Sequence, residues 1–413
     1  FPLYGIIMYN SLLNKNIIAG GGEPLSDNKS KSNLLTQLQT LRAFAFIGVF
    51  ICHTAILNNV LECVGFFGVS VFFVLSGFVM VYSYYGKQRI KNVSFVSNVK
   101  FAYSKLKRLW LLSILCTLAT TIFLFIGNAN FPILNVVLKF VLNAFWLQEW
   151  IPLYGRSINI VNWFLCSTLF GYFIFPWFLR LLETNYSKSK AIFCIILCLA
   201  VEIVVAYIGS KFPCEEKYVN GLIWDHDLTY WFVYSFPLTR IFDIIIGFNL
   251  GYLFVNKENA FTVSKTTILE ILGIVLAILG NYYFSTVSPR LHIGEQVIMT
   301  DPFRSWSYTL GFVLSSMLLV YTFAMQNGII SKFLTNRVTL YIAKLSPYAF
   351  LIHLVVFRYL AVIYYHLPGV EGNEFHLTYG CWISLTFGFV ITVIATEIWM
   401  RLYAKFIAPK KVI

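Results

Sequence analysis

The sequence predicts an all-α protein that crosses a membrane about ten times. Of its 413 residues, 58% are hydrophobic and only 12% are charged, whereas a soluble domain carries about twice that charged fraction. The mean hydropathy is +0.73. Apolar runs of roughly 20 residues, the length that crosses a bilayer as a helix, recur along the whole chain. These three observations favour a polytopic membrane protein over a water-soluble one.

Each of these apolar runs is a candidate transmembrane helix. They lie near residues 43–59, 66–85, 109–127, 160–180, 190–209, 232–254, 266–285, 306–326, 341–363 and 379–403. A further apolar stretch, 131–147, is interrupted by Asn135, Lys139 and Asn143. We expect this stretch to be interfacial or re-entrant, and an eleventh span is the alternative.

The net charge of +13 is unevenly distributed over the predicted loops. With ten spans, most Lys and Arg side chains fall on the side that carries both termini, so the positive-inside rule predicts that both termini are cytoplasmic. The positive charge therefore indicates contact with a lipid bilayer and no nucleic-acid partner. The sequence indicates no oligomeric state.

Residues 1–35 are expected to form a disordered or linker-like segment, because GGGEPLSDNKSKSN combines glycine, serine and charge without an apolar pattern. The eight cysteines show no metal-binding spacing and no CxxC motif, so we expect no metal. Cys63 and Cys214 both fall in predicted outer loops, and whether they form a disulfide is left open.

Arg42 and His53 lie in the first predicted span with only apolar and small residues between them. They are eleven residues apart, which in an α-helix is a rotation of about 20° more than three full turns, so both side chains lie on one helix face. Along the helix axis they are roughly 16 Å apart. Ionisable groups in such a position usually face a cavity or a partner. His53 is therefore a candidate functional residue, and an interior histidine bonded to a neighbouring helix is the alternative.

Small residues mark the second predicted span, GVSVFFVLSGF. Small side chains let helix backbones approach closely, which favours a packing seam for the glycines. Ser76 either belongs to this seam or donates a hydrogen bond to a catalytic group.

Lys105 and Arg108 lie three residues apart where the basic loop 86–108 meets the third predicted span. Such clusters usually anchor a helix against anionic lipid. The sharper hypothesis is a phosphate clamp, because Lys and Arg donate charge-assisted hydrogen bonds to phosphate oxygens.

Further polar residues lie within the sixth and ninth predicted spans. Arg240 and Asp243 have i, i+3 spacing, so they are expected to neutralise each other as a structural ion pair. Ser346 and His353 are seven residues apart and share a helix face. A bundle with two buried histidines and several buried charges is more often a transporter or an enzyme than a structural protein.

Taken together, these segments resemble the integral-membrane acyltransferase-3 family, which O-acylates carbohydrates. The resemblance runs from about residue 36 to 405 and predicts one transmembrane acyltransferase domain over residues 36–408. The matches, in chain order, are Arg42 with His53 (R-x10-H), GVSVFFVLSGF (68–78), KLKRLW (105–110), RIFDIIIGFNLGY (240–252) and LSPYAFLIH (345–353). One departure stands out. The family often has an acid in the fourth span, where this sequence has Thr168, although Trp163 and Tyr172 of that motif match.

The resemblance implies transfer of an acyl group, with acetyl expected, from acyl-CoA to a hydroxyl of a cell-envelope or extracellular polysaccharide. His53 would take the acceptor proton and Arg42 would assist, with Ser76, Tyr172 and His353 in support. Lys105, Arg108 and Arg42 would hold the phosphates of acetyl-CoA, which acts as co-substrate without a permanently bound cofactor.

The expected location is the bacterial cytoplasmic membrane. Direct transfer and a covalent acyl-enzyme both remain open. The alternative function is a transporter or flippase of a lipid-linked sugar or another small polar substrate, in which the buried Arg and His would line a pathway.

Overall fold

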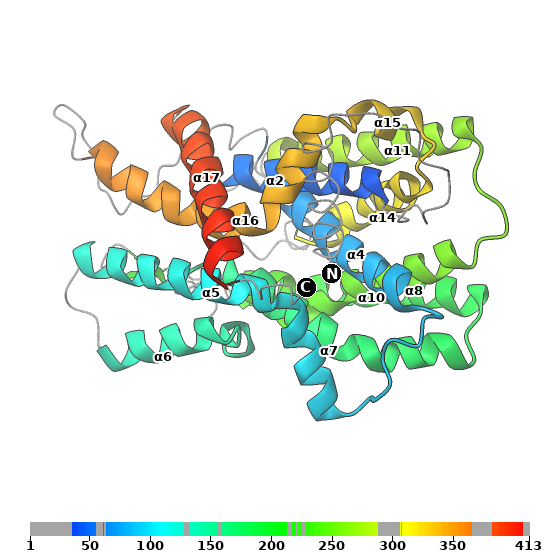
Figure 1. Ribbon diagram of the computed structural model, residues 1–413, viewed down its shortest axis with the longest axis horizontal. Helices are drawn as coiled ribbons and strands as arrows, with labels where there is room; N and C mark the ends of the chain where they lie inside the picture. Colours follow the sequence, from blue (N-terminus) through cyan, green and yellow to red (C-terminus); the bar gives the residue numbers. More distant parts are fainter. Residues whose placement is uncertain are drawn as a thin grey trace, which may run out of the picture.

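A computed structural model describes most of the chain between residues 35 and 407 (Figure 1). The described residues are 35–54, 61, 63–127, 133–152, 154, 158–212, 217–219, 222–224, 228–287, 306, 308–365 and 382–407. The predicted linker before residue 35 therefore lies outside the described residues. Cys214 also lies outside them, so the possible Cys63–Cys214 disulfide stays untested.

Helices make up almost all of the described structure, as the sequence predicts. The longer helices are α2 (Thr36–Thr54), α4 (Val64–Tyr84), α5 (Phe95–Gly127), α6 (Ile133–Ala144), α7 (Asn162–Thr184), α8 (Lys188–Gly209), α10 (Pro237–Val255), α11 (Val263–Tyr282), α14 (Leu310–Met325), α16 (Arg337–Tyr365) and α17 (Trp382–Leu402). The short ones are η1 (Gln148–Trp150), α9 (Leu228–Tyr230), η2 (Trp231–Ser235), η3 (Tyr283–Val287), α15 (Ile329–Leu334) and η4 (Tyr403–Ile407). Strands β1 (Lys217–Val219) and β2 (Leu222–Trp224) pair antiparallel between α8 and α9, with Lys217 opposite Trp224.

Among the described residues, seven helical segments are long and apolar enough to cross a membrane, judged by length and composition. They are Val64–Tyr84, Asn162–Thr184, Lys188–Gly209, Leu228–Val255, Val263–Thr286, Arg337–Ala361 and Leu385–Phe406. The other three predicted spans coincide with α2, α5 and α14, which do not meet these limits; α14, for example, has only 16 residues. The chain is thus a multi-pass membrane protein, while the count of ten and the orientation of the termini stay predictions.

A seam of glycines joins α4 to α10 at the centre of the bundle. A Cβ atom added to Gly77 would collide with the backbone oxygen of Ile244, and one added to Gly247 would collide with that of Val74. Gly251 is similarly close, since its Cβ would lie 2.8 Å from the Phe78 oxygen. Only the lack of side chains lets the two backbones pack this closely, so Gly77 of α4 and the two glycines of α10 form one packing seam.

Helix α2 packs between α4 and α16. Gly68 of α4 faces Ala45 of α2, where a Cβ would collide with the Ala45 oxygen. On its other side, α2 contributes Phe46 and Phe50 to the buried core that it shares with α16. This packing brings residues near position 50 next to residues near position 350, which no local sequence signal links.

The apolar stretch 131–147 forms the short helix α6, which runs beside α5 (Figure 1). Its 12 residues extend about 18 Å, well short of the roughly 30 Å of a bilayer core. Lys139 and Asn143 are buried, whereas Leu134 and Val137 are exposed. Helix α6, which contains the three polar residues that interrupt the apolar stretch, is therefore too short to cross a membrane.

Candidate functional site

Two histidines from distant parts of the chain meet between α2 and α16. His353 Nε2 lies 3.0 Å from His53 Nδ1, within hydrogen-bonding distance. The other ring nitrogen of His353, Nδ1, lies 3.2 Å from the backbone oxygen of Ala349, one helical turn before it. Both nitrogens of His353 thus have a partner, and one of these partners is the histidine that the sequence singled out.

Phenylalanine rings enclose His353, which has no exposed surface. The centroids of four rings lie between 5.8 and 6.3 Å from the centroid of its imidazole. They belong to Phe46 and Phe50 on α2 and to Phe350 and Phe357 on α16. His53, at the end of this enclosure, is only partly buried. The pair therefore has one imidazole held in the core and one that is accessible.

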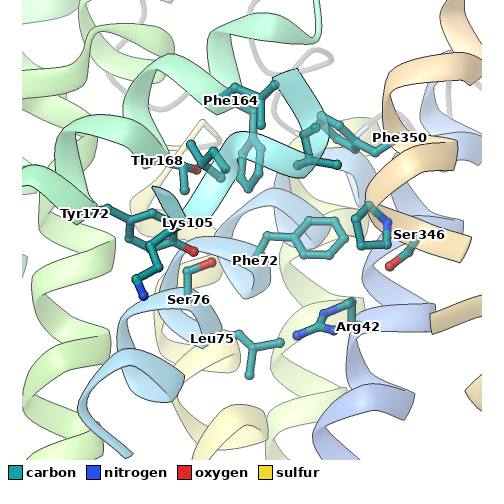
Figure 2. A pocket seen from close by; sticks show the side chains of 14 residues that line it. Arg42, Phe72, Leu75, Ser76, Lys105, Phe164, Thr168, Tyr172, Ser346 and Phe350 are labelled. Carbon is teal, nitrogen blue, oxygen red and sulfur yellow. The ribbon is translucent and has the colours of Figure 1, made fainter. Parts of the chain in front are cut away.

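Phe350 also lines a pocket, which has a cavity volume of about 70 Å³ (Figure 2). Its walls come from α2, α4, α5, α7 and α16. The polar side chains that line it are Arg42, Ser76, Lys105, Thr168, Tyr172 and Ser346. Four of the nominated site residues, each from a different helix, therefore meet around one cavity, and His53 and His353 are not part of its lining.

Arg42 and Lys105 are the two basic side chains in the lining of this pocket. Arg42 is 3% exposed, and its Nη1 donates a hydrogen bond of 2.6 Å to Gln39 Oε1. Lys105, on the part of α5 that precedes the apolar run 109–127, donates a hydrogen bond to the Tyr84 hydroxyl. Its ammonium also lies 4.6 Å from the centroid of the Phe101 ring. Both cations are thus held by neighbours at the pocket, which makes it a suitable place for an anionic group.

Burial lowers the pKa of the Lys105 ammonium from its ordinary value to about 8, and the nearby positive charge of Arg89 lowers it further in the same direction. Burial removes water that would stabilise the charged form, and a like charge disfavours that form as well. Lys105 therefore changes its charge close to physiological pH.

Ser76, Thr168 and Tyr172 lie on the wall between α4 and α7 (Figure 2). The hydroxyl groups of Ser76 and Tyr172 are within hydrogen-bonding reach of each other. Thr168, which replaces the acid usual in the related motif, faces the same cavity, and its Oγ1 has no hydrogen-bond partner among the described residues. A carboxylate at this position in a relative would thus face the same cavity as the two cations.

Arg108 is not part of the lining, although it lies only one helical turn from Lys105. Its charge acts instead on Tyr348 of α16. The structure therefore brings Lys105, and not Arg108, to the pocket that also holds Arg42.

Arg240 and Asp243 form an ion pair away from the pocket, with Nη2 3.0 Å from Oδ2 and both side chains almost fully buried. The Arg240 guanidinium also lies 4.9 Å from the Phe73 ring centroid and 5.2 Å from that of Tyr234. The ion pair that their i, i+3 spacing predicts is thus present.

Phe350 is the residue that sequence reasoning missed. It lines the pocket, and its ring centroid lies 5.9 Å from that of His353. Its ring also packs against Phe72 and Phe164, which line the same pocket (Figure 2). A signal was present, because Ser346, Phe350 and His353 follow i, i+4, i+7 spacing on one face of α16.

Among the described residues, no three His, Cys, Asp or Glu side chains come close enough together to hold a metal ion. The site instead combines an imidazole pair, hydroxyl groups and two cations. Such groups can transfer protons and bind anions.

Comparison with known proteins places this geometry in context. The sequence model of a family described as an acyltransferase domain matches residues 35–398. The acyltransferase MdmB of Streptomyces mycarofaciens is 26% identical over 228 residues, which cover 52% of this chain and 56% of that protein. The O-acetyltransferase OatA of Staphylococcus aureus is 24% identical over 341 residues, which cover 77% of this chain and 50% of that protein. The chain thus spans about half the length of these curated relatives. No solved structure matches it.

Proposed function

The chain belongs to this acyltransferase family, and on that premise we propose that it is a membrane-bound O-acyltransferase. It moves an acyl group, acetyl in the simplest case, from acyl-CoA to a hydroxyl of a cell-envelope or extracellular polysaccharide. The observation that carries the proposal is a partly exposed imidazole, His53, that contacts His353, whose neighbour Phe350 lines a pocket that contains two cations. The expected location is a bacterial cytoplasmic membrane.

The pocket suits one end of an anionic donor. Its volume of about 70 Å³ is well below the roughly 300–1,000 Å³ of sites that enclose a whole drug-sized ligand. Only part of a donor as large as acyl-CoA would therefore enter it. Arg42 and Lys105 would hold anionic or carbonyl oxygens of the donor by charge-assisted hydrogen bonds.

The distance between Arg42 and His53 along α2 gives these two residues different tasks. Arg42 and His53 are roughly 16 Å apart along the helix axis, so a single small group cannot contact both. An elongated donor can, with its phosphates toward Arg42 and its thioester toward His53. Arg42 then binds the donor, and His53 acts at the reacting atoms.

His53 acts as the general base in this scheme. The O–H bond of the acceptor breaks, and its proton passes to His53 as the oxygen attacks the thioester carbonyl carbon. The tetrahedral intermediate collapses, the C–S bond breaks, and the thiolate of CoA takes the proton back from His53. The products are the O-acyl ester and the free thiol, and His53 returns to its starting state.

Membranes that contain the protein test the proposal directly. They are incubated with [14C]acetyl-CoA, and the glycan fraction is counted before and after mild alkaline treatment, which hydrolyses O-acyl esters. The proposal expects alkali-labile label that exceeds the label in matched membranes without the protein. Equal labelling of the two membranes with acetyl-, butyryl- and longer acyl-CoA donors would contradict it. The transporter or flippase interpretation gains no support from the family to which the chain belongs.

A further inference from the structure

We infer that His353 is a positioning residue that selects which nitrogen of His53 acts as the base. The inference rests on the proposed function, because it assigns the roles of two atoms within that reaction. It follows from the hydrogen bonds of the two imidazoles and from the burial of one of them.

The proton of a neutral His353 lies on Nδ1. The backbone oxygen of Ala349, 3.2 Å away, can only accept a hydrogen bond. With the proton on Nε2 instead, the lone pair of Nδ1 would face this oxygen with no proton between them, and the two would repel each other. Turning the ring over would place carbon atoms opposite both Ala349 and His53, so the two contacts fix the orientation of the ring as well as its tautomer.

The proton of His53 follows from that of His353. With its proton on Nδ1, a neutral His353 has a lone pair on Nε2, and this nitrogen lies 3.0 Å from His53 Nδ1. His53 therefore donates from Nδ1, and its own lone pair is on Nε2. The base is thus Nε2 of His53.

The same hydrogen bond continues through the reaction. When His53 Nε2 takes the proton of the acceptor hydroxyl, the imidazolium that forms still donates from Nδ1 to the lone pair of His353. His353 thus stabilises the charged ring without itself gaining or losing a proton. Another group that orients a catalytic histidine, the aspartate of serine proteases, acts in the same manner.

Packing makes His353 suited to this role and unsuited to being the base itself. It is fully buried among Phe46, Phe50, Phe350 and Phe357, so its ring cannot turn easily and the acceptor cannot reach it. Phe46 and Phe50 lie on α2, the helix that carries His53. The enclosure therefore fixes the two imidazoles relative to each other.

Two substitutions of His353 separate hydrogen bonding from packing. In His353→Gln, the amide oxygen can take the position of Nε2 and accept the hydrogen bond from His53. In His353→Leu, the volume is similar but no acceptor remains. Tyr359→Phe is the matched control, since it removes one hydrogen bond of the same helix, from the Tyr359 hydroxyl to the Ala119 oxygen.

The transfer of label from [14C]acetyl-CoA is measured for all four proteins, at equal amounts of folded protein judged by gel filtration in detergent. We expect His353→Leu to lower kcat about tenfold or more, as for other groups that orient a functional imidazole, with a smaller change in the KM for acetyl-CoA. His353→Gln is expected to recover most of this loss, and Tyr359→Phe to match the wild type. Wild-type rates in His353→Leu, or equal losses in the Leu and Gln variants, would overturn the inference.

A spectroscopic measurement tests the hydrogen bond without any activity. In wild-type protein labelled with 15N-histidine, His53 should show a protonated Nδ1, an unprotonated Nε2 and a coupling between Nδ1 and Nε2 of His353. A proton on His53 Nε2 would overturn the inference even if acyl transfer is observed. If wild-type protein transfers no label but has this spectrum, the proposed function fails while the predicted tautomers stand.

Discussion

The ring of Phe350 lies 5.9 Å from the imidazole of His353 and also lines the pocket that holds Arg42 and Lys105. One side chain thus belongs to the proposed donor pocket and also packs against the histidine pair. With Phe72 and Phe164, it forms a group of three aromatic rings in the lining of the pocket (Figure 2). We expect an acyl group that moves from the pocket to His53 to pass these rings.

Phe350→Leu should therefore change the choice of acyl group. A smaller side chain leaves more room for acyl carbons beside the histidine pair, and each methylene in an apolar site changes discrimination by about 1–3 kcal/mol. We expect the ratio of kcat/KM for butyryl-CoA to that for acetyl-CoA to rise. Phe312→Leu, at a fully buried position outside the pocket lining, is the control. An unchanged ratio in Phe350→Leu would show that this ring does not limit the acyl chain.

Binding of the donor should depend on pH through Lys105. Burial and the charge of Arg89 lower the pKa of Lys105 to about 8, so its ammonium is charged below pH 8 and neutral above it. An anionic donor is attracted only by the charged form. The KM for acetyl-CoA should therefore rise as the pH increases from 7 to 9.

Lys105→Arg is the informative variant for this effect, because a guanidinium keeps its charge over this pH range. It should make the KM for acetyl-CoA nearly independent of pH between 7 and 9, while Lys105→Met should give a high KM at every pH. A wild-type KM that is constant over the same range would contradict a role for the Lys105 charge in donor binding.

Arg42→Gln should affect binding more than catalysis, because Arg42 lines the pocket about three helical turns from His53. Loss of a charged hydrogen bond to the donor should raise the KM for acetyl-CoA about ten- to hundredfold. The value of kcat should fall much less. The opposite result, a large fall in kcat with an unchanged KM, would place Arg42 at the reacting atoms instead.

The close packing of α4 on α10 predicts that a larger residue at a seam glycine lowers the free energy of unfolding, whatever its effect on catalysis. Gly247→Ala would push a methyl group into the backbone of α4 at Val74, and we expect it to lower the free energy of unfolding by about 1–3 kcal/mol. In Gly280→Ala, the nearest atom to the new Cβ lies 3.2 Å away, so a smaller effect is expected. Thermal unfolding in detergent compares the two, and equal midpoints would contradict the seam.

Much of the arrangement within single helices could be predicted from the sequence. Spacing alone places Arg42 and His53 on one face of α2, and Arg240 and Asp243 at the distance of an ion pair. The small residues of α4 likewise indicate close packing. These properties depend on the helical repeat, which the chain specifies locally.

Contacts between helices could not be predicted in this way. Nothing near His53 indicates that its partner is His353, because the packing of α2 on α16 joins segments 300 residues apart. Spacing also grouped Arg108 with Lys105, yet the direction of each side chain around α5 brings only Lys105 to the pocket. The role of Phe350 was hidden for a further reason, because a phenylalanine in a membrane helix is ordinarily a packing residue.

The most direct test of the central claim compares wild-type protein with His53→Ala at matched expression in membranes that receive [14C]acetyl-CoA. Removal of a general base typically lowers the rate by about 10²–10⁴-fold, so label in the alkali-labile glycan fraction should fall by at least the smaller of these factors. Equal labelling by the two proteins would contradict the account and return His53 to the role of an interior histidine bonded to a neighbouring helix.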